Sequence, residues 1–414
     1  MKFLVRLFAV AVVSMLALSC APSVPFAALK PWPGYPLINS SPTSHKRVLV
    51  IKCEMSDTVG QRPLPTNVSG KFPNLDSYFT SFYGLANGTG NVLDYLRDVT
   101  YGGMLVQTEG TNRWVTASYA SNNIPSRHDR IEKCANAIPA AEVDFSRYDS
   151  LLVLTNAVQD SGACATGPTD FTIGGTKYSL GCAIIDPNGT FTGFAAHELL
   201  HTFGLNHSWA NFPPTSCALP TGEYCDQTDM MSALKVKGFI WPNYPSPFDP
   251  GTYPGVGAGP GLNLPNLLTL NAVPQNRLLT YTVGSNLDPA PQPEAVCLTA
   301  LSHPTSDCRI GVTIDNNRNA PDTGVSTVEF RTSDGWDRGL SSTTDTVSCV
   351  LIHEYGKANA PSSVLIRRSG ADSLGCRQQG DVFSDPSGSF TVTVVAIDNT
   401  QHTATILVTP ISKG

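Results

Sequence analysis

The first two thirds of the chain alternate short apolar runs with stretches of helical periodicity. Residues 48–53 form a β-branched apolar run, and residues 148–155 contain four successive apolar side chains, which is typical of a strand buried on both faces. Residues 91–100 are apolar at 92, 93, 96 and 99, the spacing of one helix face, with Asn91 as the N-cap. This alternation predicts an α/β (α+β) domain with a twisted mixed sheet over residues 47–288. Further strands are predicted at residues 104–108 and 178–185, and a further helix at residues 127–140.

From residue 294 onward the pattern changes to short runs of alternating apolar and polar residues. None of these runs has helical periodicity, and turns rich in Gly, Asp and Ser separate them. The spacing predicts a β-sandwich over residues 289–414, joined to the α/β domain by a proline-rich linker at residues 289–293. The predicted strands are residues 326–331, 347–352, 363–367, 389–397 and 403–409.

The chain begins with a short positively charged stretch and an apolar run. Lys2 and Arg6 accompany an apolar run at residues 7–18, which has the length of a signal-peptide core and is too short to cross a bilayer. Residues 1–19 are therefore predicted to be a signal peptide, with a membrane anchor as the alternative. Residues 20–46 are rich in Pro and Ser and are interpreted as an extended leader. The mature protein is predicted to be secreted or extracellular, with no stable membrane anchor.

Composition and charge narrow the classes of function. The chain has 414 residues, of which 41% are hydrophobic and 14% are charged, so it is globular and long enough for two domains. Its net charge of −6 provides no basic surface of the kind that binds nucleic acid. We therefore expect no nucleic-acid partner.

The cysteine content agrees with export. Apart from Cys20 there are ten cysteines, and an even number in an exported chain indicates up to five disulfides. Spacing does not determine the pairing, although nearness along the chain favours one set. Asn67, Asn87 and Asn188 stand in glycosylation sequons. The favoured disulfides are Cys53–Cys134, Cys164–Cys182, Cys217–Cys225, Cys297–Cys308 and Cys349–Cys376.

The chemistry of the chain is concentrated between His197 and His207. His197 and His201 are four residues apart, so on a helix they share one face and can bind one ion. Gly204 is predicted to end the helix in a left-handed conformation, after which the chain turns back and supplies His207 as a third ligand. Three imidazoles with an open fourth position are typical of catalytic zinc, whereas structural zinc has four protein ligands. Glu198 is predicted to act as general base on water activated by Zn²⁺.

This motif, H-E-x-x-H-x-x-G-x-x-H, resembles that of the metzincin zinc endopeptidases. Other segments resemble the gametolysin family, with some likeness to immune inhibitor A-type peptidases. The resemblance implies a metzincin-like catalytic domain with an active-site helix, and a methionine turn beneath the metal at Met231, with Met230 as second choice. Some metzincins have a tyrosine two residues after this methionine; that position is Ala233 here, so no such tyrosine is expected. The resembling segments are residues 91–102, 143–149, 228–231 and 263–266, and in the small β domain residues 328–337, 350–353 and 380–383.

These residues predict a secreted zinc-dependent endopeptidase that hydrolyses peptide bonds of extracellular, cell-wall or matrix proteins. The likeness to gametolysin implies a cell-wall glycoprotein as substrate. The strand predicted at residues 178–185, interpreted as the edge strand beside the cleft, would bind an extended peptide by strand addition. Two alternatives stay open: a matrix-binding or adhesion protein with a vestigial zinc site, and a zinc hydrolase of non-peptide amides.

Other candidate sites in the sequence are less specific. Residues 315–322 are rich in Asp and Asn but lack the spacing of an EF-hand calcium loop, so they are interpreted as a solvated turn. No G-x-S-x-G sequence supports a Ser-His-Asp triad. The histidines outside the motif are scattered and are interpreted as ordinary surface or core residues: His45, His128, His303, His353 and His402.

Overall fold

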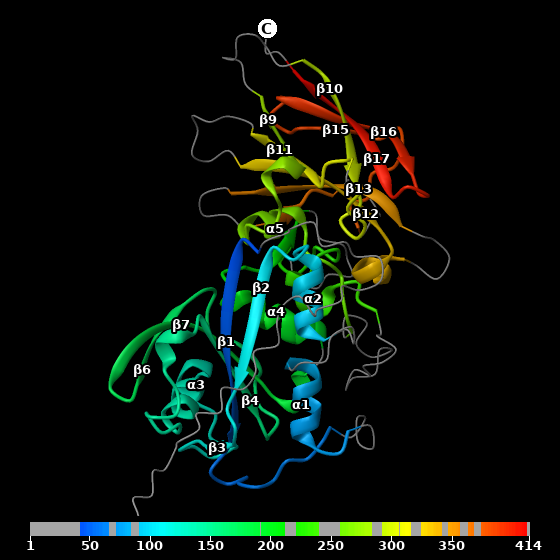
Figure 1. The fold of residues 1–414 in the computed structure, drawn as a ribbon. Helices are drawn as coiled ribbons and strands as arrows, with labels where there is room; N and C mark the ends of the chain where they lie inside the picture. The colour runs from blue at the N-terminus through cyan, green and yellow to red at the C-terminus, as the bar shows by residue number, and fades with distance from the viewer. Residues whose placement is uncertain are drawn as a thin grey trace, which may run out of the picture.

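The computed structural model describes most of the chain between residues 42 and 411 (Figure 1). The predicted signal peptide, nearly all of the leader, the sequons at Asn67 and Asn87 and most of the predicted linker and solvated turn lie outside the described residues. Among the helices that are described, none combines the length and the apolar character needed to cross a membrane. The described residues are 42–65, 72–83, 91–190, 192–211, 221–239, 257–283, 292–305, 307–315, 324–341, 347–356, 363–367 and 374–411.

The N-terminal half is built around a mixed sheet of seven strands. Strands β2, β1, β4 and β7 run parallel in that order, β5 and β6 pair antiparallel with β7, and β3 pairs with β1. Every residue of β4 is buried, which confirms the prediction of a strand apolar on both faces. The strands are β1 (Ser44–Glu54), β2 (Met104–Gly110), β3 (Val115–Thr116), β4 (Ser150–Thr155), β5 (Gly162–Ala163), β6 (Thr169–Ile173) and β7 (Thr176–Ile185).

Different helices cover the two faces of this sheet (Figure 1). Leu152 and Leu154 of β4 lie in one core with α2 and α4, whereas the alternate residues Leu151 and Val153 lie in a second core with α3. Helix α4 is therefore packed between the sheet and α2, which leaves it almost no exposed surface. The helices of this half are α1 (Leu75–Tyr83), α2 (Val92–Val99), α3 (Arg127–Asn136), α4 (Thr192–Thr202) and α5 (Leu264–Thr269).

Local sequence signals set the ends of two helices. The Asn91 side chain accepts a hydrogen bond from the Asp94 N–H at 2.9 Å, which confirms the predicted N-cap of α2. Helix α3 ends at Asn136 and not at the predicted residue 140, because Pro139 disfavours helical backbone in the residue before it.

Two strands of the sheet differ from the prediction. Strand β1 begins at Ser44, within the predicted leader, because the backbone of residues 44–46 pairs with residues 104–106 of β2, and this pairing does not require apolar side chains. The predicted edge strand at residues 178–185 is not the edge of the sheet, since β4 pairs with residues 181–185 of β7, β5 with residues 183–184 and β6 with residues 176–180. The outer strand beside it is β5, so the prediction that residues 178–185 form the edge strand is wrong.

Two further sheets enclose one hydrophobic core, the arrangement of a β-sandwich. The first has the order β10-β17-β16-β15, and the second has the order β8-β14-β13-β12-β11-β9. Phe390 and Ile406 from the first sheet meet Phe330 and Ile352 from the second, all of them fully buried. The strands are β8 (Ser208–Ala210), β9 (Leu278–Thr282), β10 (Glu294–Thr299), β11 (Gly311–Asp315), β12 (Val325–Thr332), β13 (Ser348–Tyr355), β14 (Ser363–Leu365), β15 (Val382–Ser384), β16 (Phe390–Asp398) and β17 (Thr403–Pro410).

The second of these sheets takes two strands from the region predicted as catalytic domain. Strand β8, directly after His207, pairs in parallel with β14, and β9 pairs in parallel with β11. The boundary predicted between residues 288 and 289 therefore does not coincide with the division between the sheets. The sheet that belongs to the sandwich begins at the residue after the third predicted metal ligand.

The described disulfides follow the predicted pairing. Cys53–Cys134 joins β1 to α3, Cys164–Cys182 lies beside β5, and Cys297–Cys308 and Cys349–Cys376 lie in the sandwich. Cys225 is disulfide-bonded, and its predicted partner Cys217 lies outside the described residues. This cysteine usage is compatible with an oxidising, extracellular environment.

Candidate metal centre

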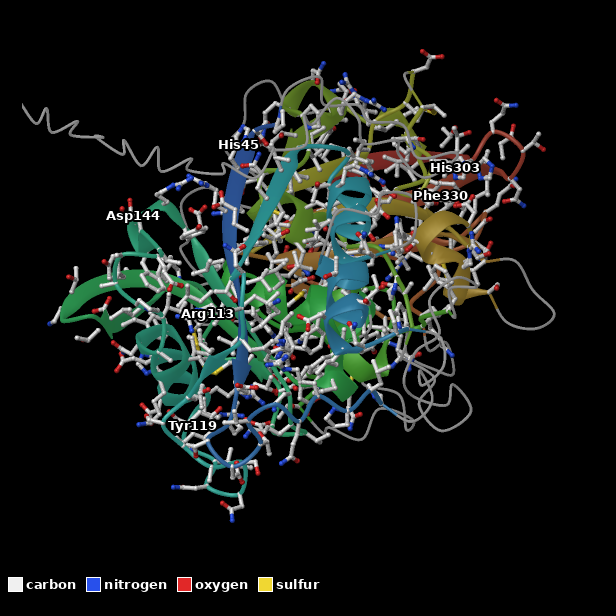
Figure 2. All side chains as sticks on the ribbon, turned by 60° about the horizontal axis from the view of Figure 1, so that its bottom comes forward. His45, Arg113, Tyr119, Asp144, His303 and Phe330 are labelled. Atoms are coloured by element: carbon white, nitrogen blue, oxygen red, sulfur yellow. A yellow bond between two sulfur atoms is a disulfide. The ribbon has the colours of Figure 1, made fainter. Side chains whose placement is uncertain are left out.

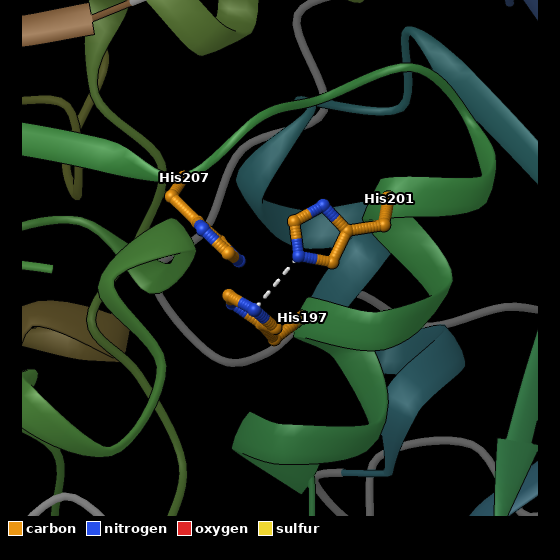
Figure 3. Close-up of side chains that lie close together, drawn as sticks. All are labelled: His197, His201 and His207. Carbon is orange, nitrogen blue, oxygen red and sulfur yellow. Dashed lines mark hydrogen bonds between the residues drawn. The ribbon is translucent and has the colours of Figure 1, made fainter. Parts of the chain in front are cut away.

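Helix α4 and the strand that follows it bring the three predicted ligands together. His197 and His201 project from the same side of α4, and His207 approaches from the start of β8 (Figure 3). The ring centroids are 4.5 Å apart for His197 and His201, 4.7 Å for His201 and His207, and 5.5 Å for His197 and His207. The structure thus places all three imidazoles in one cluster.

The turn that ends α4 also orients one of the ligands. Gly204 has φ +100°, and the Gly204 N–H donates to the His201 carbonyl at 3.0 Å while the Leu205 N–H donates to the Leu200 carbonyl at 3.2 Å. These two bonds form a Schellman motif, which confirms the predicted glycine stop. The Leu205 carbonyl then lies 2.6 Å from His201 Nδ1. The same turn therefore ends the helix and fixes an imidazole.

Each histidine is anchored through its Nδ1 atom. His197 Nδ1 lies 3.0 Å from the Met230 carbonyl, and His201 Nδ1 lies 2.6 Å from the Leu205 carbonyl. His207 Nδ1 lies 2.6 Å from Oε1 of Glu223. All three partners are oxygen acceptors, so each Nδ1 carries the proton and donates it. This tautomer leaves every Nε2 atom with its lone pair, and metal-binding histidines are usually oriented by such a bond from the other nitrogen.

The Nε2 atoms face one another at short range. Those of His197 and His201 are 2.9 Å apart, the contact drawn in Figure 3, and the ligand atoms of the three histidines all lie within 4.8 Å of one another. Two lone pairs at this distance repel unless a cation lies between them. Nitrogen ligands of a tetrahedral zinc ion are about 3.3 Å apart, given Zn–N distances near 2.0–2.1 Å. The donor set therefore fits a metal ion.

Burial keeps two of these ligands neutral. It lowers the pKa of His197 to about 3 and that of His201 to about 4, with the neighbouring histidines adding to the effect. Both imidazoles are therefore unprotonated at neutral pH. Neutral imidazole is the form that binds a metal ion.

Glu198 follows the first ligand on α4 and is buried beside the cluster. Its Oε2 accepts a hydrogen bond from the Ala163 N–H of β5 at 2.6 Å, and burial raises the pKa of its carboxyl group. Arg127 donates to the Ala163 carbonyl at 3.0 Å, so β5 is held on both sides of this residue. A side chain at Gly162 would collide with the Arg127 guanidinium, which explains the glycine there. The outer strand of the sheet thus orients Glu198.

Tyr224 is a functional candidate that the sequence analysis did not identify. Its hydroxyl lies 2.9 Å from His207 Nε2, and its ring lies 4.1 Å from the His207 ring. Burial, together with the negative charge of Glu223, raises the pKa of Tyr224 to about 12, so the hydroxyl keeps its proton at neutral pH. A tyrosine therefore does reach the histidines, although not from position 233, which the resemblance singled out; it comes from a different turn. The Tyr224 backbone at φ +60° aims the ring at the cluster.

The predicted methionine turn lies next to the ligands. Met230 and Met231 begin the 3₁₀ helix η4 (Met230–Lys235), which packs against α4, and both side chains are buried in the core that contains α4. The contact with a ligand comes from the backbone of Met230, the second choice, whose carbonyl holds His197. Met231 contributes a fully buried side chain to the same core.

A buried carboxylate fixes this turn. Asp229 Oδ1 accepts hydrogen bonds from the Met231 N–H at 2.7 Å, from Ser208 Oγ at 2.9 Å and from Asn266 Nδ2 at 3.0 Å. Asp229 Oδ2 accepts one from the Asn263 N–H at 2.5 Å. The segments that carry Met230 and His207 are therefore joined through one side chain.

Three histidines interpreted as ordinary surface or core residues have carboxylate partners in the structure. His353 of β13 is fully buried, with Nε2 at 3.1 Å from Oδ2 of Asp226. Burial opposes its charged form, but Glu329, Asp226 and other carboxylates outweigh burial and raise the pKa of His353. His303 and His402 lie in the sandwich with their rings stacked at 4.2 Å (His303 is labelled in Figure 2). His353 is therefore a core residue, one of the two predicted interpretations, whereas His303 and His402 are not scattered but lie together.

The comparisons with known proteins leave the family open. No protein-family model matches this chain, and a search of curated proteins finds no match either. The resemblance to metzincins and to gametolysin therefore rests on the sequence motifs, whereas the capacity to bind a metal ion rests on the geometry of His197, His201 and His207.

Proposed function

We propose that this protein is a zinc-dependent endopeptidase of extracellular or cell-wall proteins. The observation that carries the proposal is the convergence of three imidazoles, each with its Nδ1 anchored to an oxygen acceptor, beside a buried carboxylate that is not one of the ligands. His197, His201 and His207 would hold the ion. Three protein ligands are typical of catalytic zinc.

Zinc, when bound, supplies a Lewis acid that polarises a substrate carbonyl and makes water more acidic. Glu198 is positioned to move the proton. Its Oε2 is held by the Ala163 N–H, so Oε1 takes the proton from the attacking water and then delivers it to the departing amine. Because burial raises its pKa, this carboxylate binds a proton more readily than an exposed glutamate does.

Tyr224 is suited to stabilise the charge that develops on the substrate oxygen. Its hydroxyl is protonated, lies on the His207 side of the cluster, and can donate a hydrogen bond. A donor already in place when negative charge develops contributes more to the rate than one that must reorient. The proposed roles are therefore general base for Glu198 and oxyanion donor for Tyr224.

The experiment that tests this proposal compares Glu198→Gln with Glu142→Gln in the mature protein. Glu142 is exposed, and its one ion-pair partner among the described residues is the exposed Arg113, so its variant controls for loss of a carboxylate. We expect Glu198→Gln to lower kcat on a casein substrate by about 100-fold or more, the usual contribution of a general base, with the zinc content unchanged. Glu142→Gln should cleave like wild type.

Chelation and substrate choice separate the alternatives. A chelator should abolish cleavage, and added Zn²⁺ should restore it. Cleavage of small acyl-amides with no cleavage of casein would favour a non-peptide amidase. Matrix binding with zinc bound but no hydrolysis of any protein would favour an adhesion protein with a vestigial site. If Glu198→Gln retained wild-type activity, the assigned role of this carboxylate would be refuted.

A further inference from the structure

A second group of potential metal ligands lies in the sandwich, away from α4. It consists of His303, in the turn after β10, Asp334, directly after β12, and His402, in the turn between β16 and β17. The ligand atoms of these three residues all lie within 4.8 Å of one another, as they do in the α4 cluster. The three residues come from both sheets of the sandwich, since β12 belongs to one sheet and β10, β16 and β17 to the other.

The donor atoms converge on one carboxylate oxygen. His303 Nδ1 and His402 Nδ1 each lie 3.0 Å from Oδ2 of Asp334. Contacts with His303 and Ser302 oppose burial and lower the pKa of Asp334. Within the described part of the chain, the two nitrogens and the two Asp334 oxygens are buried and have no partner with good hydrogen-bond geometry. Buried polar atoms without partners are rare and call for a ligand, an ion or a water molecule.

The surrounding backbone holds these side chains in position. The Ala300 N–H donates to the His402 carbonyl and the Ala300 carbonyl accepts from the His303 N–H, both at 2.9 Å. His402 has φ +51°, an uncommon conformation for a residue with a side chain. Asp334 occupies the N-cap position of the 3₁₀ helix η6 (Gly335–Leu340), yet its side chain makes no capping bond and faces the histidines. Helix capping, the usual role of an aspartate at this position, therefore does not explain the orientation of the Asp334 side chain.

We propose that His303, Asp334 and His402 form a second metal site, which binds Zn²⁺ or a similar divalent transition-metal ion and joins the two sheets of the sandwich. Two imidazole nitrogens and one carboxylate oxygen are ligands that such ions accept. The ion replaces the missing hydrogen bonds and links three turns that are distant in sequence. Because it binds the folded sandwich and not the unfolded chain, it stabilises the fold.

The competing explanation is an ion pair between Asp334 and a protonated histidine, with no metal. Metal content distinguishes the two. The mature full-length protein is stripped with a chelator, reconstituted with Zn²⁺ and freed of excess metal, and zinc per chain is measured by mass spectrometry. The variants are His303→Gln/His402→Gln, Asp334→Asn and His197→Gln/His201→Gln. His45→Gln is the matched control, because His45 is an exposed histidine on β1, far from the sandwich site (Figure 2).

We expect two zinc ions per chain in wild type and in the His45 control, and one in each of the other variants. Added Zn²⁺ should raise the Tm of the His197→Gln/His201→Gln protein, and the additional change Asp334→Asn should remove that rise. If His197→Gln/His201→Gln bound no zinc, the second site would be refuted. This result does not depend on whether the sandwich variants fold. Equal zinc content in wild type and folded Asp334→Asn would refute it as well.

Discussion

Arg331 of β12 offers the sharpest test of how the sandwich supports the metal centre. Its side chain is fully buried, and its five N–H groups make five hydrogen bonds. It donates to both oxygens of Asp337 and to Glu329, which neutralises its charge. It also donates to the Thr228 carbonyl at 2.8 Å and to the Leu262 carbonyl at 3.3 Å. We expect Arg331→Met to keep the approximate volume and remove all five bonds.

The expected loss follows from what the substitution leaves behind. Asp337 and Glu329 would stay buried without their cation, and removing one partner of a buried ion pair costs about 3–5 kcal/mol. Typical domains are stable by only about 5–15 kcal/mol, so this is a large fraction of the total. Thr228 lies two residues before Met230, whose carbonyl holds His197. Arg331→Met should therefore lower zinc affinity as well as stability.

The measurement is the free energy of unfolding in urea, together with zinc affinity by competition with a chelating dye. Arg113→Met is the control, because Arg113 makes an exposed pair with Glu142 and its loss should cost less than about 1 kcal/mol. A stability loss for Arg331→Met no larger than that of Arg113→Met would contradict the reasoning. If the protein were clearly destabilised but its zinc affinity unchanged, the stability argument would hold and only the proposed effect of Arg331 on His197 would be contradicted.

Four further outcomes are expected. Gly204→Ala should destabilise the protein by about 1–2 kcal/mol in thermal unfolding, because alanine disfavours φ +100°; an unchanged Tm would exclude this. Glu223→Gln should weaken zinc binding about 10–100-fold, since Glu223 anchors His207; equal affinity in a chelator competition would contradict that role. Tyr224→Phe should lower kcat about 100-fold with little change in KM, whereas a change confined to KM would assign it to substrate binding. The pKa of His353 is raised in the folded state, so its protonation stabilises the fold. This contribution is full below the unfolded pKa of about 6.5 and is lost as pH rises through the folded value. His353→Gln should abolish this part of the pH dependence of the unfolding free energy, measured in urea titrations.

The residues of α4 could be predicted from sequence because their determinants are local. The four-residue spacing of His197 and His201, and a glycine three residues later, encode one helix face and one helix end. The side chains that complete the cluster are not local in this sense. Glu223 and Tyr224 reach His207 from 16 and 17 residues away, through a turn that has no periodic pattern. Only the folded chain brings them to the metal ligands.

The division between the sheets could not be placed from the sequence for a related reason. Strand β8 has three residues, too few for an alternating pattern, and its place in a sheet is decided by its pairing with β14. The composition change near residue 289 indicated where further strands begin. It did not indicate that the earlier strands β8 and β9 also belong to a sheet of the sandwich. Similarly, His303 and His402 are far apart in sequence, and the two turns that carry them meet only because β10 pairs with β17.

The positions of the three proposed metal ligands depend on both halves of the chain. His197 is held by the Met230 carbonyl in a turn fixed by Asp229, and Arg331 of the sandwich bonds to Thr228 in the same segment. His207 directly precedes β8, whose pairing with β14 sets the position of the third imidazole. A protein cut after residue 288 would keep every residue of the motif, yet it would lose the strand beside β8 and the hydrogen bond from Arg331 to the Thr228 carbonyl. The histidine motif therefore does not lie in a unit separate from the sandwich, and the sandwich helps to position the three histidines.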